Sequence, residues 1–342
     1  MKKLRLKSVI SAAVIALTAT GLTGIAGAAE ILRSDTDAQG ASGHTMIVVA
    51  SKIWRRELDG LSVQVNDSQT LTRSALKLGS GKLEVMPLPT AVATFLQNGE
   101  RMYAKDLKEQ AIAASKNIGG IMGWLAVTVH PIVWGDSGIE GWQDVKGKRI
   151  FLGPPSGAAA VNSIQLIRAL TGFEPDEDYE AIKMPWGSGL QAMLDGKVDV
   201  FFRPSGMGSA AVEQLGQKKK FRILDSRTGD AAGLAKFIEP DHMFEIEIPA
   251  GTYTSQVDND KGVMTTGGTF NLAVSSELSD DMVYGMTKAI WENLDEMKQT
   301  AVTLQSIDSD RPFIGANVPL HPGAARYYTE AGIEIPENLK PR

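Results

Sequence analysis

The sequence predicts an α/β fold of two lobes with largely parallel sheets. Extended and helical patterns alternate through most of the chain, as they do where helices cover parallel sheets. The chain has 342 residues, 43% of them hydrophobic, so it can bury more than one core. Two extended stretches, near residues 128–134 and 263–270, are expected to cross from one lobe to the other.

The first 29 residues are expected to be a secretory signal peptide rather than part of the fold. Four basic residues precede an apolar stretch over residues 9–25, and the small residues Ala26, Gly27 and Ala28 follow it. Glycines, serines and threonines interrupt the stretch, which suits a cleaved signal better than a membrane span. Because no cysteine follows it to carry a lipid, we expect a protein free in the periplasm that does not itself span the membrane.

Charge and cysteine content exclude several classes of function. The absence of cysteine excludes disulfide frameworks, cysteine-ligated metals and thiol nucleophiles, and four histidines leave little for a metal site. No metal or cofactor is therefore expected. Without the leader, 31 basic residues face 40 acidic ones, so a nucleic-acid partner is not expected. The run Lys218-Lys219-Lys220 is interpreted as a solvated turn.

The predicted elements of the first lobe follow in order from the leader. A short strand over residues 30–33 leads into a polar loop over 34–43. A helix comes next, because apolar residues recur there at three- and four-residue spacing: Met46, Ala50, Ile53, Trp54 and Leu58. Alternation over residues 61–65 then predicts a half-buried strand that ends in the polar loop 67–70.

The second lobe is predicted as a compact α/β unit. A strand over residues 149–152 is followed by a Gly- and Pro-containing loop and a helix over 158–170, which Gly172 ends. Buried strands are predicted over 198–202 and 221–224, with a helix over 208–215 between them. Beyond residue 248 we expect an extended stretch over 263–274, one long amphipathic helix over 283–297 and a last helix from Pro322.

The predicted boundaries are residues 1–29 for the leader, 30–130 with 268–342 for lobe I, and 131–267 for lobe II. The C-terminal part of the chain thus returns to the first lobe.

Five segments between residues 136 and 332, behind a signal peptide, carry a family resemblance. They are Asp136-Ser137-Gly138-Ile139 with residues 144–149, Gly153-Pro154-Pro155-Ser156-Gly157, Ile248-Pro249-Ala250-Gly251-Thr252-Tyr253, Val283-Tyr284-Gly285-Met286-Thr287-Lys288, and Pro319-Leu320-His321-Pro322-Gly323-Ala324 with Tyr327, Tyr328 and Glu330. In this order they resemble the TAXI family, the solute-receptor subunits of TRAP transporters. One departure is Gly40-Ala41-Ser42-Gly43-His44, where that family usually carries a Gly/Thr-rich loop ending in tyrosines.

The resemblance implies a two-lobed fold of the periplasmic-binding-protein kind, type II-like, with a hinge between the lobes. It implies a small anionic ligand of the glutamate, 2-oxoglutarate or dicarboxylate class. The partner it implies is a TRAP membrane permease on a separate chain.

Candidate ligand residues in lobe II lie where loops follow strands. Ser156, Gly157 and Ala158 open a helix, whose N–H groups suit a carboxylate, although Ser156 could simply cap the helix. Arg203 is expected at the carboxyl end of a strand, before a turn over residues 204–206, where its guanidinium could clamp a carboxylate. The alternative is an ordinary surface arginine. Trp186 could form the floor of the pocket, although core packing suits it better, as it does Trp124.

Candidate ligand residues in lobe I are Ser42, His44 and Thr45 at a helix start, and Ser68 and Thr70 after a strand. All can donate hydrogen bonds, but capping and turn bonding explain Ser42 and Ser68 equally well. Three acids, Asp35, Asp37 and Asp67, could hold an ammonium group if the ligand is an amino acid. His321 is interpreted as a helix cap or a packing residue rather than a catalytic one.

Two other functions compete with transport. An enzyme on a similar scaffold is disfavoured, because there is no cysteine to hold the cofactor of porphobilinogen deaminase and no nucleophile turn of the Gly-x-Ser-x-Gly kind. A ligand-sensing receptor for a signalling partner would use the same fold and pocket. We therefore expect a binding protein rather than an enzyme.

Overall fold

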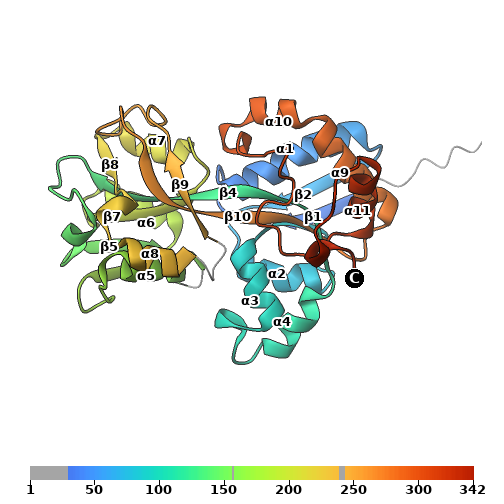
Figure 1. Cartoon of the computed structure of the whole chain (residues 1–342), viewed down its shortest axis with the longest axis horizontal. Helices are drawn as coiled ribbons and strands as arrows, with labels where there is room; N and C mark the ends of the chain where they lie inside the picture. The colour runs from blue at the N-terminus through green and yellow to red at the C-terminus, as the bar shows by residue number, and fades with distance from the viewer. Residues whose placement is uncertain (1–29, 156–157, 239–242) are drawn as a thin grey trace, which may run out of the picture.

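The computed structural model describes residues 30–155, 158–238 and 243–342. The predicted signal peptide lies outside the described residues, as do Ser156 and Gly157. The strands form one mixed sheet in the order β2-β1-β3-β10-β4-β7-β5-β6, with β8 paired to β4 and β9 to β10. Two long strands, β4 (Ile118–Trp134) and β10 (Val263–Ser275), run through both halves of the molecule and join them (Figure 1). The predicted two-lobed α/β periplasmic-binding-protein fold is confirmed.

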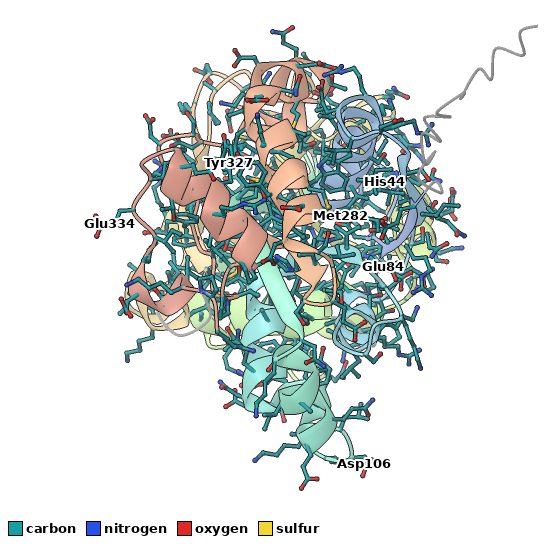
Figure 2. All side chains as sticks on the ribbon, turned by 90° about the vertical axis from the view of Figure 1, so that its right-hand side faces the viewer. His44, Glu84, Asp106, Met282, Tyr327 and Glu334 are labelled. Atoms are coloured by element: carbon teal, nitrogen blue, oxygen red, sulfur yellow. The ribbon has the colours of Figure 1, made fainter. Side chains whose placement is uncertain are left out.

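Lobe I contains the first three strands and two groups of helices. Its strands are β1 (Glu30–Asp35), β2 (Leu61–Asn66) and β3 (Val85–Pro89), and β1 pairs in parallel with both others. Its helices are α1 (Ser42–Glu57), α2 (Leu71–Gly79), α3 (Thr90–Asn98), α4 (Lys108–Ser115), α9 (Asp280–Glu292), α10 (Leu294–Thr300) and α11 (Pro322–Glu330), with the short 3₁₀ turn η4 (Val302–Leu304). Figure 2 shows Met282 and Tyr327 on the adjacent helices α9 and α11.

Lobe II contains the middle of the chain. Its strands are β5 (Arg149–Gly153), β6 (Glu180–Lys183), β7 (Val200–Ser205), β8 (Phe221–Ile223) and β9 (Met243–Ile248). Its helices are α5 (Ala158–Thr171), α6 (Trp186–Leu194), α7 (Ala210–Gly216) and α8 (Ala231–Ile238). β5 pairs in parallel with β6 and β7, so the loops after these three strands emerge on one edge of the sheet.

Separate hydrophobic cores support the two lobes. Trp54, Trp124 and Phe270 pack in the largest cluster, which α1, α9 and α11 cover. Trp124 is fully buried, so the expectation that it packs in a core is confirmed. In lobe II, Val133 and Phe202 belong to one cluster and Phe151 and Phe201 to another.

Three sequence predictions are wrong in detail. The sheet is mixed rather than largely parallel, because the crossing strands β4 and β10 run antiparallel to each other and to their other neighbours β3 and β7. The predicted single helix over residues 283–297 is two helices, α9 and α10. They are separated at Asn293, whose backbone leaves the helical region and whose side-chain amide donates to the Ala289 carbonyl oxygen at 2.8 Å.

The third error concerns Arg203, which is inside a strand rather than at its end. β7 continues through Pro204 to Ser205, and these residues pair with β4. β5 pairs only with Val200 and Phe201, so the other edge of β7 is open beyond them. Proline has no N–H to donate and is tolerated on such an edge. The predicted turn over residues 204–206 therefore begins too early.

Within the described ranges, no helix is long and apolar enough to cross a membrane.

Candidate ligand site between the lobes

Two loops of lobe I are tied together at the carboxyl ends of β1 and β2. The Ser68 amide donates to the Asp37 carbonyl oxygen at 3.0 Å, and the Gln69 amide donates to that of Thr36 at 2.9 Å. α1 starts at Ser42, a few residues after the first of these loops. The structure thus brings the predicted residues His44 and Ser68 into one cluster beside Asp37.

Asp37 faces the first turn of α1. Its Oδ1 accepts the His44 amide proton at 2.6 Å, and a Cβ at position 43 would lie only 2.9 Å from the same oxygen, so Gly43 permits this approach. Burial raises the pKa of Asp37 to about 6, although the His44 amide and the positive charge of Arg203 both oppose the rise. Asp37 therefore holds a costly charge close to Arg203 of the other lobe.

The other two acids of lobe I have partners already. Asp35 binds Lys77 Nζ at 2.7 Å and Ser74 Oγ at 2.8 Å. Burial alone would raise the pKa of Asp35, but these hydrogen bonds outweigh it, so the pKa is lowered. Asp67 is half-buried and accepts hydrogen bonds from Gln39 and Ser68. Of the three candidates for an ammonium group, only the half-buried Asp37 has a pKa that responds to the charge of Arg203 in the other lobe.

The other side chains predicted to bind ligand in lobe I differ in burial and in hydrogen-bond partners. Ser42 is buried, and its Oγ lies 3.5 Å from Nε1 of Trp124. Thr70 precedes α2 without a side-chain cap, and Thr45 is half-buried on α1. His44 Nδ1 lies 3.0 Å from the Thr36 hydroxyl oxygen, and burial lowers the pKa of His44 despite the opposing charge of Asp67.

Arg203 is the buried cation of lobe II. It is only 7% exposed and lies opposite His130 in the β4–β7 register. Its Nε is buried and has no hydrogen-bond partner within the described part of the chain. Burial lowers the pKa of Arg203, and the Asp37 charge partly offsets this. A buried guanidinium with an unused donor suits an incoming anion.

Trp186 supports Arg203. The guanidinium carbon lies 5.1 Å from the centroid of the Trp186 ring, within range of a cation–π contact. The ring packs edge-on against Phe151 with centroids 5.6 Å apart. Gly153, with φ +115°, leaves room for the ring, since a Cβ there would approach it to 3.1 Å. Trp186 is half-buried and positions Arg203 while still packing on lobe II.

The lobes touch at two places beside these residues. In the loop after β7, a Cβ on Gly206 would lie 2.6 Å from Thr303 Cβ, and one on Gly208 would lie 2.7 Å from Val302 Cγ1. Both partners belong to η4, which packs on α1 in lobe I. Ala158, the first residue of α5, packs against the lobe I cluster formed around β3 and helices α2 to α4. The two lobes are therefore in contact at the loop after β7 and at the start of α5.

Sequence reasoning missed two residues beside Arg203. His130 is fully buried, with Nδ1 2.9 Å from the Arg203 carbonyl oxygen, and Tyr253 contacts its other ring nitrogen at 2.8 Å. Tyr253 lies within residues 248–253, which carry part of the family resemblance, but only its contact with His130 and the β4–β7 register of His130 relate it to Arg203.

Other features lie away from this site. His321 caps α11, as expected, because its Nδ1 accepts the Gly323 amide proton at 3.2 Å. Two open grooves, of about 690 and 670 Å³, are lined by lobe I residues that include Asn317 and Thr329 respectively, and Arg203 lines neither. Among the described residues, no cluster of histidine and acidic side chains is arranged to hold a metal ion.

Comparison with known proteins decides the family. The model of the NMT1-like family matches residues 51–332, which is most of the chain. The chain belongs to the NMT1-like family. This membership supports a protein of the periplasmic solute-binding type.

Solved structures similar to this NMT1-like chain share little sequence with it. A periplasmic sulfonate-binding protein from Methylobacillus flagellatus is 14% identical, with a TM-score of 0.44 over 92% of this chain and 81% of that one. A TRAP solute-binding protein from Sulfitobacter with bound β-D-galacturonate is 10% identical (TM-score 0.46; 89% of this chain, 88% of that one). Another, from Ralstonia eutropha with bound (S)-2-acetolactate, is also 10% identical (TM-score 0.47; 88% of this chain, 90% of that one). At these scores the likenesses assign no ligand to this chain.

Proposed function

We propose that this chain is a periplasmic solute-binding protein of the TAXI type that serves a TRAP transporter. It reaches the periplasm through its signal peptide and captures a small organic acid or acidic amino acid between its lobes. It then delivers this ligand to a membrane permease on a separate chain and catalyses no reaction.

The proposal rests on the burial of Arg203 and on its unpaired side-chain donor. Arg203 is only 7% exposed, its guanidinium lies against Trp186, and its Nε has no hydrogen-bond partner among the described residues. Burying such a group without an acceptor is costly, and a carboxylate would supply two parallel hydrogen bonds. The position of Arg203 beside the interlobe contacts supports a carboxylate bound between the lobes.

The proposed lobe boundaries, 30–130 with 268–342 and 131–267, imply a hinge in the crossing strands. On β4, Ala126 packs in the lobe I core and Val129 in the lobe II core. Between Gly268 and Thr269 the β4–β10 register shifts and skips Ala126. A bulge of this kind, next to Gly267 and Gly268 of β10, is a place where paired strands can bend.

Asp37 favours an amino acid within this ligand class. The site already contains one anion, Asp37, near one cation, Arg203. A ligand with an ammonium group and a carboxylate can pair the ammonium with Asp37 and the carboxylate with Arg203. An acid without an ammonium group brings a second negative charge close to Asp37 with no positive group to offset it.

Calorimetric titration of wild type, Arg203→Ala and Arg203→Lys tests the proposal, after a thermal-shift panel of glutamate, 2-oxoglutarate, hydroxyacids and dicarboxylates has chosen the ligand. We expect Arg203→Ala to cost about 2–5 kcal/mol of binding free energy, because it removes one partner of a buried charged pair. Lysine should rescue only part of it, since it lacks the planar fork.

Arg149→Ala is the matched control. Arg149 is also a strand arginine of lobe II, but it is paired with Asp199 at 2.7 Å near the surface. The control should bind as wild type does. If Arg203→Ala binds within about threefold of wild type, less than 1 kcal/mol, the ligand is not held by Arg203. If no acid in the panel binds the wild type, the proposed ligand class is wrong.

A further inference from the structure

The segment Ile248-Pro249-Ala250-Gly251-Thr252-Tyr253 delivers one tyrosine into lobe II. It turns sharply, since the Thr252 amide donates to the Pro249 carbonyl oxygen at 3.2 Å and Gly251 has φ +79°. A turn with glycine in that conformation at its third position is of type II. Tyr253, directly after the turn, is fully buried, with its ring edge-on to His130 and Phe221.

A chain of three hydrogen bonds passes through Tyr253. The Gly208 amide donates to the Tyr253 oxygen at 3.0 Å, and that oxygen lies 2.8 Å from His130 Nε2. His130 Nδ1 lies 2.9 Å from the carbonyl oxygen of Arg203. Chemistry fixes the direction of each bond. A carbonyl oxygen only accepts, so Nδ1 carries the ring proton, and the bare Nε2 accepts from the tyrosine hydroxyl.

Histidine in this position stays neutral near pH 7. Burial lowers the pKa of His130 to about 4, although its hydrogen bond to the Arg203 carbonyl acts in the opposite sense. Neutral His130 carries one ring proton, which is the number that these hydrogen bonds require. A buried chain whose members are all satisfied holds its groups in one arrangement.

The series of hydrogen bonds links the proposed anion-binding residue to the loop that contacts lobe I. One end is the main chain of Arg203, the proposed anion-binding residue. The other is Gly208, in the loop that contacts η4 of lobe I. His130 itself lies on β4, one of the strands that cross between the lobes. The loop that meets lobe I and the residue that faces the ligand thus share one rigid connection.

We propose that Tyr253 and His130 are positioning residues that lock the Gly206–Gly208 loop and Arg203 into one unit, so that closure of the lobes against η4 and the hold of Arg203 on the ligand depend on each other. This inference rests on the proposed function, because it takes Arg203 as the ligand-binding residue. Neither Tyr253 nor His130 is required to touch the ligand.

Tyr253→Phe tests the connection with least disturbance, since it keeps the ring and removes only the hydroxyl. Tyr103→Phe is the control: Tyr103 is equally buried in lobe I, and its hydroxyl donates to the Thr72 carbonyl oxygen at 2.6 Å. With L-glutamate as the probe, Tyr253→Phe should raise Kd about tenfold, mainly through faster dissociation, while Tyr103→Phe leaves Kd unchanged.

The same change in an Arg203→Lys background separates positioning from general damage. If Tyr253 acts through Arg203, Tyr253→Phe should raise Kd less than twofold in the Arg203→Lys background. An equal loss in both backgrounds, or no loss in either, overturns the proposal. A loss with Tyr253→Phe but none with Arg203→Ala contradicts instead the assignment of Arg203 to the ligand.

Hydrogen exchange of the protein without ligand decides the connection even if L-glutamate does not bind. Tyr253→Phe should speed amide exchange at least tenfold over residues 201–208, including the strand at Arg203, and Tyr103→Phe should not. Faster exchange at Gly208 alone, with Arg203 and its strand neighbours unchanged, would show that the two ends are not linked and would overturn the inference.

Discussion

At the scale of single residues, the site depends on two charges, a buried one on Arg203 and a half-buried one on Asp37. Arg203 is held by the ring of Trp186, and Asp37 by amide protons at the start of α1. Each charge lowers the cost of burying the other, as the mutual shifts in their pKa values show. A ligand that enters between Arg203 and Asp37 changes the cost of burying each charge. Its affinity should therefore depend on the ionisation of Asp37.

The first prediction follows from the pKa of Asp37. An ammonium group needs the ionised carboxylate, which is present above about pH 6 and lost as the pH falls through that value. L-glutamate should therefore bind about tenfold more tightly than 2-oxoglutarate at pH 7.5, and the preference should shrink towards pH 5. Calorimetry of the two acids, which differ only in amino against keto group, measures it.

Asp37→Asn should remove both the preference and its pH dependence, because the amide keeps an acceptor for the His44 amide without carrying charge. Its effect on stability has a defined sign. The raised pKa of Asp37 stabilises the folded wild type below about pH 4, and this contribution is lost as the pH rises through about 6. Asp37→Asn should thus match wild type in Tm at pH 4 and exceed it at pH 7.5. A pH-independent preference for glutamate in Asp37→Asn would contradict the role of Asp37.

The sequence suggests Arg203 and His44 as ligand residues, because polar residues after predicted strands tend to meet at one edge of a sheet, and that assignment stays a prediction. The sequence was not sufficient to rank the three acids. Asp35 and Asp37 differ in their surroundings: Lys77 and Ser74, which neutralise Asp35, reach it only after α2 packs beside β1. His130 was missed because its function depends on its strand register with Arg203.

At the scale of elements, the loop after β7 packs closely against η4, where the two lobes meet. Neither Gly206 nor Gly208 leaves room for a Cβ against η4. The sequence could interpret these glycines only as turn residues, because the residues they approach are about a hundred positions away. The break between α9 and α10 was missed for a similar reason: Arg56 of α1 donates to Asn293 at 2.7 Å, a tertiary contact that favours the break.

Gly206→Ala should weaken ligand binding without unfolding the protein. The added methyl overlaps Thr303 in the closed form, and overpacking of this kind costs about 1–3 kcal/mol. Since an open form lacks the contact, Tm without ligand should stay as in wild type while Kd rises by roughly five- to 150-fold. Thermal melting and calorimetry measure the two effects.

Gly141→Ala provides the comparison, because a Cβ there meets only the Thr228 side chain, at 3.3 Å, within lobe II. It should bind as wild type does. Wild-type affinity in Gly206→Ala would show that the ligand is held without the contact between the loop and η4.

At the scale of the whole molecule, the alternation of strands and helices was enough to predict two lobes, and the crossing stretches fall on β4 and β10. What the alternation could not predict is that the two strands pair with each other along most of their length and merge both lobes into one sheet. Antiparallel pairing between segments so distant in sequence leaves no local pattern. The same pairing confines the proposed hinge to the bulge near Gly268, where the two strands lose register.

If the lobes close on Arg203 to capture a small anion, the distance between the lobes must change as the ligand is titrated in. The chain has no cysteine, so Asp106→Cys at the tip of lobe I (Figure 2) and Glu177→Cys in lobe II give a specifically labelled pair of exposed positions. Energy transfer between the labels should change saturably with the acid that binds best, and should not change in the same pair carrying Arg203→Ala. A saturated wild-type protein whose label distance is unchanged, or an Arg203→Ala protein that closes at the same concentration, would contradict the account.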